Sequence, residues 1–141
     1  MPTHPPRTGS RRMNKSDYEA LAEFRYRLRR FLRFSEEVTQ ANGITPLQYQ
    51  LMLQIKGFPK RDWASVTELA ERLQARHHGV VALVSRCEAL GLVRRQASAD
   101  DLRRVEIRLT RRGEQCVKQL ARVHREELRS LQGFMTLQET P

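Results

Sequence analysis

The sequence has few of the features that mark membrane, secreted or metal-binding proteins. It has no long apolar run, and residues 1–15 lack the apolar segment that a signal peptide needs, so we expect neither a membrane span nor secretion. The two cysteines are single and far apart, and no cysteine and histidine spacing typical of zinc is present. We therefore predict no metal and no cofactor. Two reduced cysteines are typical of a cytoplasmic protein.

Aromatic and acidic residues are also scarce. Aromatic residues make up 6% of the 141 residues, and a protein that stacks single-stranded bases is expected to carry more rings. The 26 Lys and Arg residues outnumber the 16 Asp and Glu residues, which gives a formal net charge of +10 at pH 7. This charge points to a polyanionic partner, either nucleic acid or an anionic membrane surface. The length favours one domain, and 39% hydrophobic residues can fill its core.

Two short helices separated by a tight turn are predicted between residues 65 and 90. Ser65 and Glu68 have capping-box spacing, and this first helix should end near Gln74. The second helix, from about His77 to Leu90, carries an apolar stripe that includes Cys87. Its other face combines hydrogen-bonding and small apolar groups, which suit base edges in a major groove. The candidate contact residues are Arg76, His77, His78, Val81, Ala82, Ser85 and Arg86. Such helix pairs also occur in many helical domains that bind no DNA.

A β-hairpin is predicted directly after these helices. Gly91 is placed to end the second helix, and residues 92–96 have strand character. Val105, Ile107 and Leu109 then alternate with charged residues, after a charged tip at residues 97–103. The order helix, turn, helix, hairpin is that of a winged helix.

Four segments resemble the multiple-antibiotic-resistance-regulator (MarR) family of bacterial transcription regulators. They are ITPLQYQLMLQI at 44–55, TELAERL at 67–73, VSRCEALGLVRR at 84–95 and DLRRVEIRLTRRG at 101–113. The last is similar to the family's wing pattern, an aspartate, an arginine two residues later, a leucine-threonine pair and a glycine. Gln74 and Gly79 stand where a turn glycine and a small hydroxyl residue are more usual, and Leu102 where a basic residue is common.

The resemblance implies a mainly α fold with a small two- or three-stranded β wing and terminal dimerisation helices. It also implies that Asp101 holds an arginine by a charge-assisted bond. Arg103 is expected to reach into a minor groove, and a tip that only faces solvent is the alternative. The candidate wing contacts are Arg95, Asp101, Arg103 and Arg104. The family's effector cavities lie between the dimer helices and the part that reads DNA, so a small aromatic or other small-molecule effector is expected.

The two ends of the chain are predicted to form long helices. Ser16 and Glu19 have capping-box spacing, and the helix that they open should run to about Ala41. Its apolar stripe exceeds what one small domain covers, which favours a homodimer, although packing wholly within one subunit is the alternative. Thr110 should cap the last helix, which places His124 on its buried side and is expected to be interrupted at Gly133. The candidate dimerisation residues are Leu21, Phe24, Leu28, Phe31, Leu128, Leu131 and Phe134.

These predictions give one winged-helix domain at residues 16–141, preceded by a disordered basic arm at 1–15. The domain has a reading head at about 44–110 and dimerisation helices at about 16–41 and 111–137. Residues 57–64 are expected to form a loop in which Trp63 caps the core, with ligand contact as an alternative role. Cys87 and Cys116 are expected to pack in the interior, with oxidant sensing as the alternative.

The predicted function is that of a cytoplasmic, dimeric, sequence-specific regulator that binds double-stranded DNA. We expect a repressor that acts on an inverted-repeat operator and is relieved by a small ligand. The alternative is a winged-helix module that binds proteins without sequence-specific DNA binding. Glu88, Asp100 and Asp101 could suggest a metal-dependent nuclease, but no base or glycine-rich cradle accompanies them, so we predict that the protein is not an enzyme.

Overall fold

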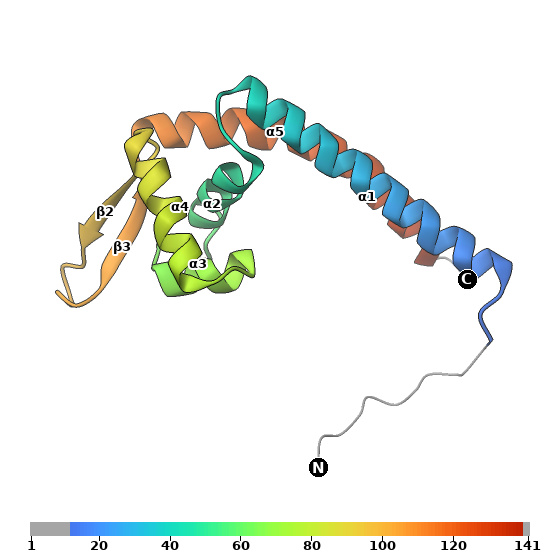
Figure 1. The fold of residues 1–141 in the computed structure, drawn as a ribbon, viewed down its shortest axis with the longest axis horizontal. Coiled ribbons are helices and arrows are strands. Elements are labelled where there is room, and N and C mark those ends of the chain that lie inside the picture. The colour runs from blue at the N-terminus through green and yellow to red at the C-terminus, as the bar shows by residue number, and fades with distance from the viewer. Residues whose placement is uncertain (1–11, 140–141) are drawn as a thin grey trace, which may run out of the picture.

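The structure is a computed structural model that describes residues 12–139. In chain order its elements are α1 (Lys15–Ala41), α2 (Pro46–Lys56), β1 (Trp63–Ala64), α3 (Val66–Leu73), α4 (His77–Ala89), β2 (Val93–Ala97), β3 (Val105–Leu109) and α5 (Arg111–Glu139). Figure 1 shows α1 and the C-terminal part of α5 packed along each other as a long arm, with the reading head at one end and the β2–β3 hairpin projecting from it. The strands form one antiparallel sheet in the order β1-β3-β2. The predicted mainly α fold with a small wing is confirmed.

The helices begin where side chains can satisfy their first backbone amides. Thr45 and Gln48 form a capping box at α2, and Ser65 and Glu68 form another at α3, as the sequence predicts. The predicted capping box of α1, Ser16 and Glu19, is wrong by two residues. Asn14 and Asp17 form that capping box, with reciprocal bonds of 3.0 Å. Asparagine is a strong N-cap residue, so the same spacing is satisfied two residues earlier in the chain.

Two further boundary predictions are corrected. α5 continues through Gly133 to Glu139, because a glycine weakens a helix by about 1 kcal/mol but still supplies its backbone N–H. Lys15 belongs to α1 rather than to the disordered segment predicted at residues 1–15. Residues 1–11 of that segment lie outside the described part of the chain. The loop predicted at 57–64 ends in a short strand, because Trp63 and Ala64 pair with Arg108 and Ile107 of β3.

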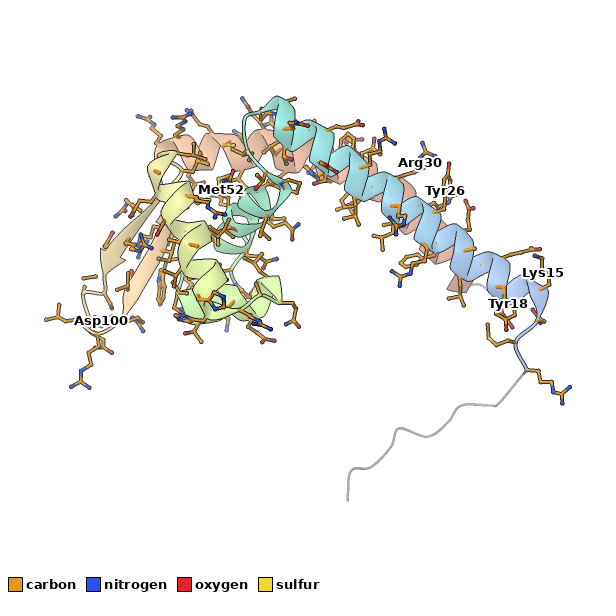
Figure 2. All side chains as sticks on the ribbon, viewed as in Figure 1. Lys15, Tyr18, Tyr26, Arg30, Met52 and Asp100 are labelled. Atoms are coloured by element: carbon orange, nitrogen blue, oxygen red, sulfur yellow. The ribbon has the colours of Figure 1, made fainter. Side chains whose placement is uncertain are left out.

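The core of the reading head lies between α2, α3, α4 and the inner face of the sheet. Met52, Leu69, Val84 and Ile107 are fully buried there, and Figure 2 shows Met52 inside the head. Cys87 is fully buried in the same cluster, and Cys116 packs against it, as predicted. This core supplies a rigid base on which α4 and the hairpin are held.

A buried histidine joins the arm to the reading head. The Nε2 of His124 on α5 lies 2.8 Å from the hydroxyl oxygen of Ser35 on α1, and its Nδ1 lies 2.7 Å from the carbonyl oxygen of Leu120. The ring stacks on Tyr49 of α2 with a centroid distance of 4.4 Å. Three helices thus meet at one side chain, and His124 occupies the buried side of α5 as predicted.

Candidate nucleic-acid interface

The outer face of α4 is a continuous exposed surface. All seven residues predicted from the sequence to contact DNA there are exposed, while Val80, Leu83, Val84 and Cys87 on the opposite side are buried. Arg76 is the N-cap of α4 and makes no side-chain capping bond, so the first amides of the helix stay available to water or phosphate. Contact with DNA by these residues remains a prediction.

The turn between α3 and α4 holds the two helices at a fixed angle. Gln74 adopts a left-handed conformation with φ of 50°, which explains why glycine is more usual at this place. The amide of Ala75 donates to the carbonyl of Ala70 at 2.9 Å, which closes the end of α3. α4 therefore starts two residues later with its N-terminus facing away from the core.

Ser85 on α4 is linked to the wing by Arg95 on β2. Nη2 of Arg95 donates to the hydroxyl oxygen of Ser85 at 3.0 Å, and Nη1 donates to Oε1 of Glu88 at 2.6 Å. Ser85 thus accepts a bond within the protein and keeps its own O–H to donate. If Ser85 contacts a base, the structure favours an acceptor atom on that base. Arg95 fixes Ser85 in place, although the sequence suggested only a DNA contact for it.

The root of the wing is fixed by close backbone contacts. Gly91 has a backbone φ of +73°, a conformation that residues other than glycine rarely adopt. The hydroxyl of Thr110 donates to the carbonyl of Gly91 at 2.6 Å and accepts from the amide of Gly113 at 3.0 Å. A Cβ atom on Gly113 would lie 2.0 Å from the carbonyl oxygen of Leu92, so no larger residue fits there. The threonine and glycine of the wing pattern therefore join α5 to the end of α4.

The tip of the wing is organised by Ser98 and Asp101. Ser98 is buried, and its hydroxyl oxygen accepts from the amides of Asp100 and Asp101 at 3.2 and 3.3 Å. Oδ1 of Asp101 accepts from the backbone amide of Arg103 at 3.0 Å. Asp101 thus orients the backbone of Arg103, whereas the family resemblance implied a bond to an arginine side chain. Arg103 is exposed, and Figure 2 shows Asp100 at the far end of the hairpin.

Arg104 lies against the body of the wing. Its guanidinium donates to Ser98 at 3.0 Å, lies 3.7 Å from Glu106 and stands 4.7 Å from the centroid of the Trp63 ring. Arg61 stacks on the same indole at 3.8 Å. Trp63, Arg61 and Ser98 are residues that the sequence analysis did not connect with the wing. The only sequence signal was a single tryptophan beside basic residues, and strand pairing over more than 40 residues decides its place.

Burial changes the chemistry of the two thiols. Burial raises the pKa of Cys87 to about 11, with a smaller contribution from Cys116. Burial also raises the pKa of Cys116, and the charge of Arg112 partly opposes this. Both thiols are therefore poorer nucleophiles at neutral pH than free cysteine, which favours packing over oxidant sensing.

Within residues 12–139 no three His, Cys, Asp or Glu side chains are grouped so that they could hold a metal ion. No helix there has both the length and the apolar character to cross a membrane.

A helix-turn-helix followed by a projecting β-hairpin, which completes a three-stranded sheet with β1, defines a winged-helix protein. Residues 42–104 match the sequence model of the MarR family. No curated protein matches the sequence significantly. The matched segment spans α2 to the wing tip and includes α4, so the similarity to this family covers the winged-helix part of the chain.

Several solved structures have the same fold as this chain. AbsC of Streptomyces coelicolor, described as a MarR family transcriptional regulator, is 20% identical with a TM-score of 0.71, over 86% of this chain and 82% of AbsC. A MarR family protein from Bacillus stearothermophilus is 23% identical with a TM-score of 0.71, over 85% and 82%. A MepR mutant of S. aureus bound to an oligodeoxyribonucleotide is 23% identical with a TM-score of 0.65, over 82% of each chain.

Proposed function

We propose that the protein is a dimeric transcription regulator that binds a specific sequence in double-stranded DNA, acting in the cytoplasm. The observation that carries this proposal is the exposed face of α4, which has no acidic residue among its seven candidate contacts, together with the exposed Arg103 at the wing tip. A helix of this kind fits a major groove, and an arginine on a hairpin fits the neighbouring minor groove. The net charge of +10 and the DNA-bound MepR structure support the same partner.

The dimer is supported by apolar surface on the arm. Tyr18, Leu21 and Leu32 of α1 are 58%, 58% and 52% exposed, and Leu128 of α5 is 38% exposed. Figure 2 shows Tyr18 and Tyr26 projecting from α1. Leu28, Phe24 and Phe31 are half-buried, as is Leu131, so a partner could cover more of the predicted stripe. The side chain of Phe134 lies outside the described part of the structure.

Two-fold symmetry gives the proposed mechanism. Two copies of α4 would enter successive major grooves about 34 Å apart, so the operator should be an inverted repeat. A groove of about 460 Å³ between α1 and α5 has an aromatic wall of Tyr26, Phe31 and Phe34 beside Arg30. Arg27, Glu23 and Glu127 also line the groove, so its charges are mixed and a small aromatic molecule suits it. Its binding would change the spacing of the two α4 helices and relieve repression.

The test is a selection from random DNA duplexes with the full chain. The proposal expects an inverted-repeat consensus and, by sedimentation, a dimer at micromolar concentration. His78→Ala and Ser85→Ala should each alter the consensus and lose about 1 to 3 kcal/mol of binding free energy for the original sequence. Gln119→Ala, an exposed substitution on α5, is the control and should leave both unchanged.

The alternative functions give different results in the same experiment. A protein-interaction module would return no consensus, and a nuclease would cut duplexes when a divalent metal is added. An unchanged consensus and affinity in both α4 variants would mean that α4 does not read the sequence.

A further inference from the structure

The outer face of the wing sheet carries a cluster in which two arginines, Arg61 and Arg104, stack on the ring of Trp63. Trp63 pairs with Arg108 across β1 and β3, so alternation along β3 puts Arg104, Glu106 and Arg108 on the same face as the indole. Glu106 is buried there, with Arg108 at 2.8 Å and Arg104 at 3.7 Å. A carboxylate buried in this way needs a cationic partner, because an unpaired buried charge is costly, and Arg108 is the closer of the two.

The cluster extends in one direction to the wing tip. The guanidinium of Arg104 lies over Trp63 and also donates to Ser98, the buried hydroxyl that accepts the amides of the tip. Its Nε is buried and makes no hydrogen bond within the described residues, so stacking on the indole is a main part of what holds the group. The conformation of residues 98–103 is therefore tied to the position of Trp63.

In the other direction the cluster reaches the helix-turn-helix. Arg61 lies over the rings of Trp63 and Phe58, at 3.8 and 4.2 Å, and forms an ion pair with Oε2 of Glu68. The other oxygen of Glu68 accepts the amide of Ser65 at 2.9 Å in the capping box that starts α3. One chain of contacts thus runs from the first turn of α3 through Trp63 to the wing tip.

We propose that Trp63, with Arg61 and Arg104 stacked on it, is a positioning cluster that fixes the angle between the wing and the helix-turn-helix, and so places Arg103 against DNA. The proposal rests on the proposed function, since it assumes that Arg103 binds DNA beside the site read by α4. The three residues act through Arg103 and need no DNA contact of their own. This role differs from the direct contact that the sequence suggested for Arg104.

A double-mutant cycle on DNA binding tests the proposal. Affinity for the duplex recovered by the selection is measured by fluorescence anisotropy for wild type, Trp63→Ala, Arg103→Ala and the double variant. Each single variant should bind on the order of tenfold more weakly, and Trp63→Ala should have almost no further effect once Arg103 is absent. Trp63→Phe, which keeps an aromatic face for both arginines, should restore most of the lost affinity.

The matched control is Arg94→Ala. Arg94 lies opposite Arg108 on β2, and its guanidinium bonds to Gln96 rather than stacking on Trp63. Its removal takes one positive charge from the wing and should weaken binding by the same factor whether Arg103 is present or not.

A second variant and a second readout guard against simple misfolding. Arg104→Met leaves the indole in place and should reproduce the dependence on Arg103. Trp63 is the only tryptophan, so its emission in DNA-free protein should shift to longer wavelength when Arg104 no longer covers the ring.

The possible results separate the two proposals. If the wild-type protein recovers no duplex, the proposed function fails, and this inference fails with it. If the wild type binds but Trp63→Ala and Arg103→Ala weaken binding by independent factors, only the positioning role is wrong. Trp63→Ala could also weaken binding in the Arg103→Ala background but not in the Arg104→Met background. That result would show that Arg104 contacts DNA itself, which also overturns the proposal.

Discussion

Replacing Asp101 in two ways separates its structural role from its charge. Oδ1 of Asp101 accepts from the amide of Arg103 at 3.0 Å, and the side chain is exposed. Asp101→Asn keeps an oxygen that can accept this bond and removes the negative charge. Asp101→Ala removes both the charge and the acceptor. The two variants should therefore change operator affinity in opposite directions.

The magnitudes follow from the geometry of the tip. A hydrogen bond of this type contributes about 1 kcal/mol, and its loss should weaken binding about fivefold if Arg103 must be ordered to contact DNA. A negative charge about 10 Å from a phosphate opposes binding by roughly 0.4 kcal/mol in water, and salt reduces this further. Asp101→Asn should therefore bind up to about twofold more tightly than wild type. Asp101→Ala should bind more weakly, because the lost bond outweighs the removed repulsion.

The assay is anisotropy with the selected duplex at several salt concentrations. At about 0.15 M salt, Asp101→Asn should bind at least as tightly as wild type, and Asp101→Ala should bind more weakly than both. Equal tightening in both variants at every salt concentration would mean that Asp101 only repels DNA. Equal weakening in both would mean that its charge matters and the backbone bond does not. Either result would refute the reasoning from the observed bond.

The remaining predictions concern stability at a fixed protein concentration. Ser35→Ala should lower the free energy of unfolding, measured in urea, by about 1 to 3 kcal/mol, because it leaves a buried ring nitrogen of His124 unpaired. Adding His124→Phe should recover part of this loss. An effect of Ser35→Ala below about 0.5 kcal/mol would contradict the prediction. Burial raises the pKa of Cys87 to about 11, so as the pH rises the thiol ionises in the unfolded chain before it ionises in the folded protein. The free energy of unfolding should therefore fall between about pH 9 and pH 11, and it should fall less in Cys87→Ala. An equal fall in both proteins would show that Cys87 is not the cause.

Local interactions explain why much of the fold could be predicted from the sequence. The capping boxes at Thr45 and Ser65 involve residues three positions apart, and the stripe of α4 depends only on helical periodicity. The exposed candidates on α4 follow from the same periodicity. Thr110 and Gly113 are recognisable from the wing pattern, and the structure adds the reason, a close approach to Leu92.

The features that were missed depend on contacts between distant residues. β1 has two residues, too few for any periodicity, and exists only because β3 lies beside it. The same pairing brings Trp63 to Arg104, so the position of that arginine over the indole could not be predicted from the sequence of the tip. The cap of α1 was missed for another reason, since Asn14 and Ser16 offer competing starts and only the backbone decides between them.

The arginines of the reading head fall into two groups with different consequences for binding. Arg61, Arg95, Arg104 and Arg108 form ion pairs with acidic residues of the same head and hold the wing to the helices. The other arginines of the head form no ion pair within residues 12–139. They are Arg72, Arg76, Arg86, Arg94 and Arg103.

Only the second group can neutralise phosphates without first losing a carboxylate partner. The salt dependence of binding counts the phosphates neutralised, with a slope of about 0.9 per phosphate. The net charge of +10 should therefore overstate the number of phosphate contacts, because it sums the charges of the whole chain, including those of α1 and α5. A shallow slope with strong sequence preference would fit a protein in which paired arginines set the geometry and a few unpaired arginines bind DNA.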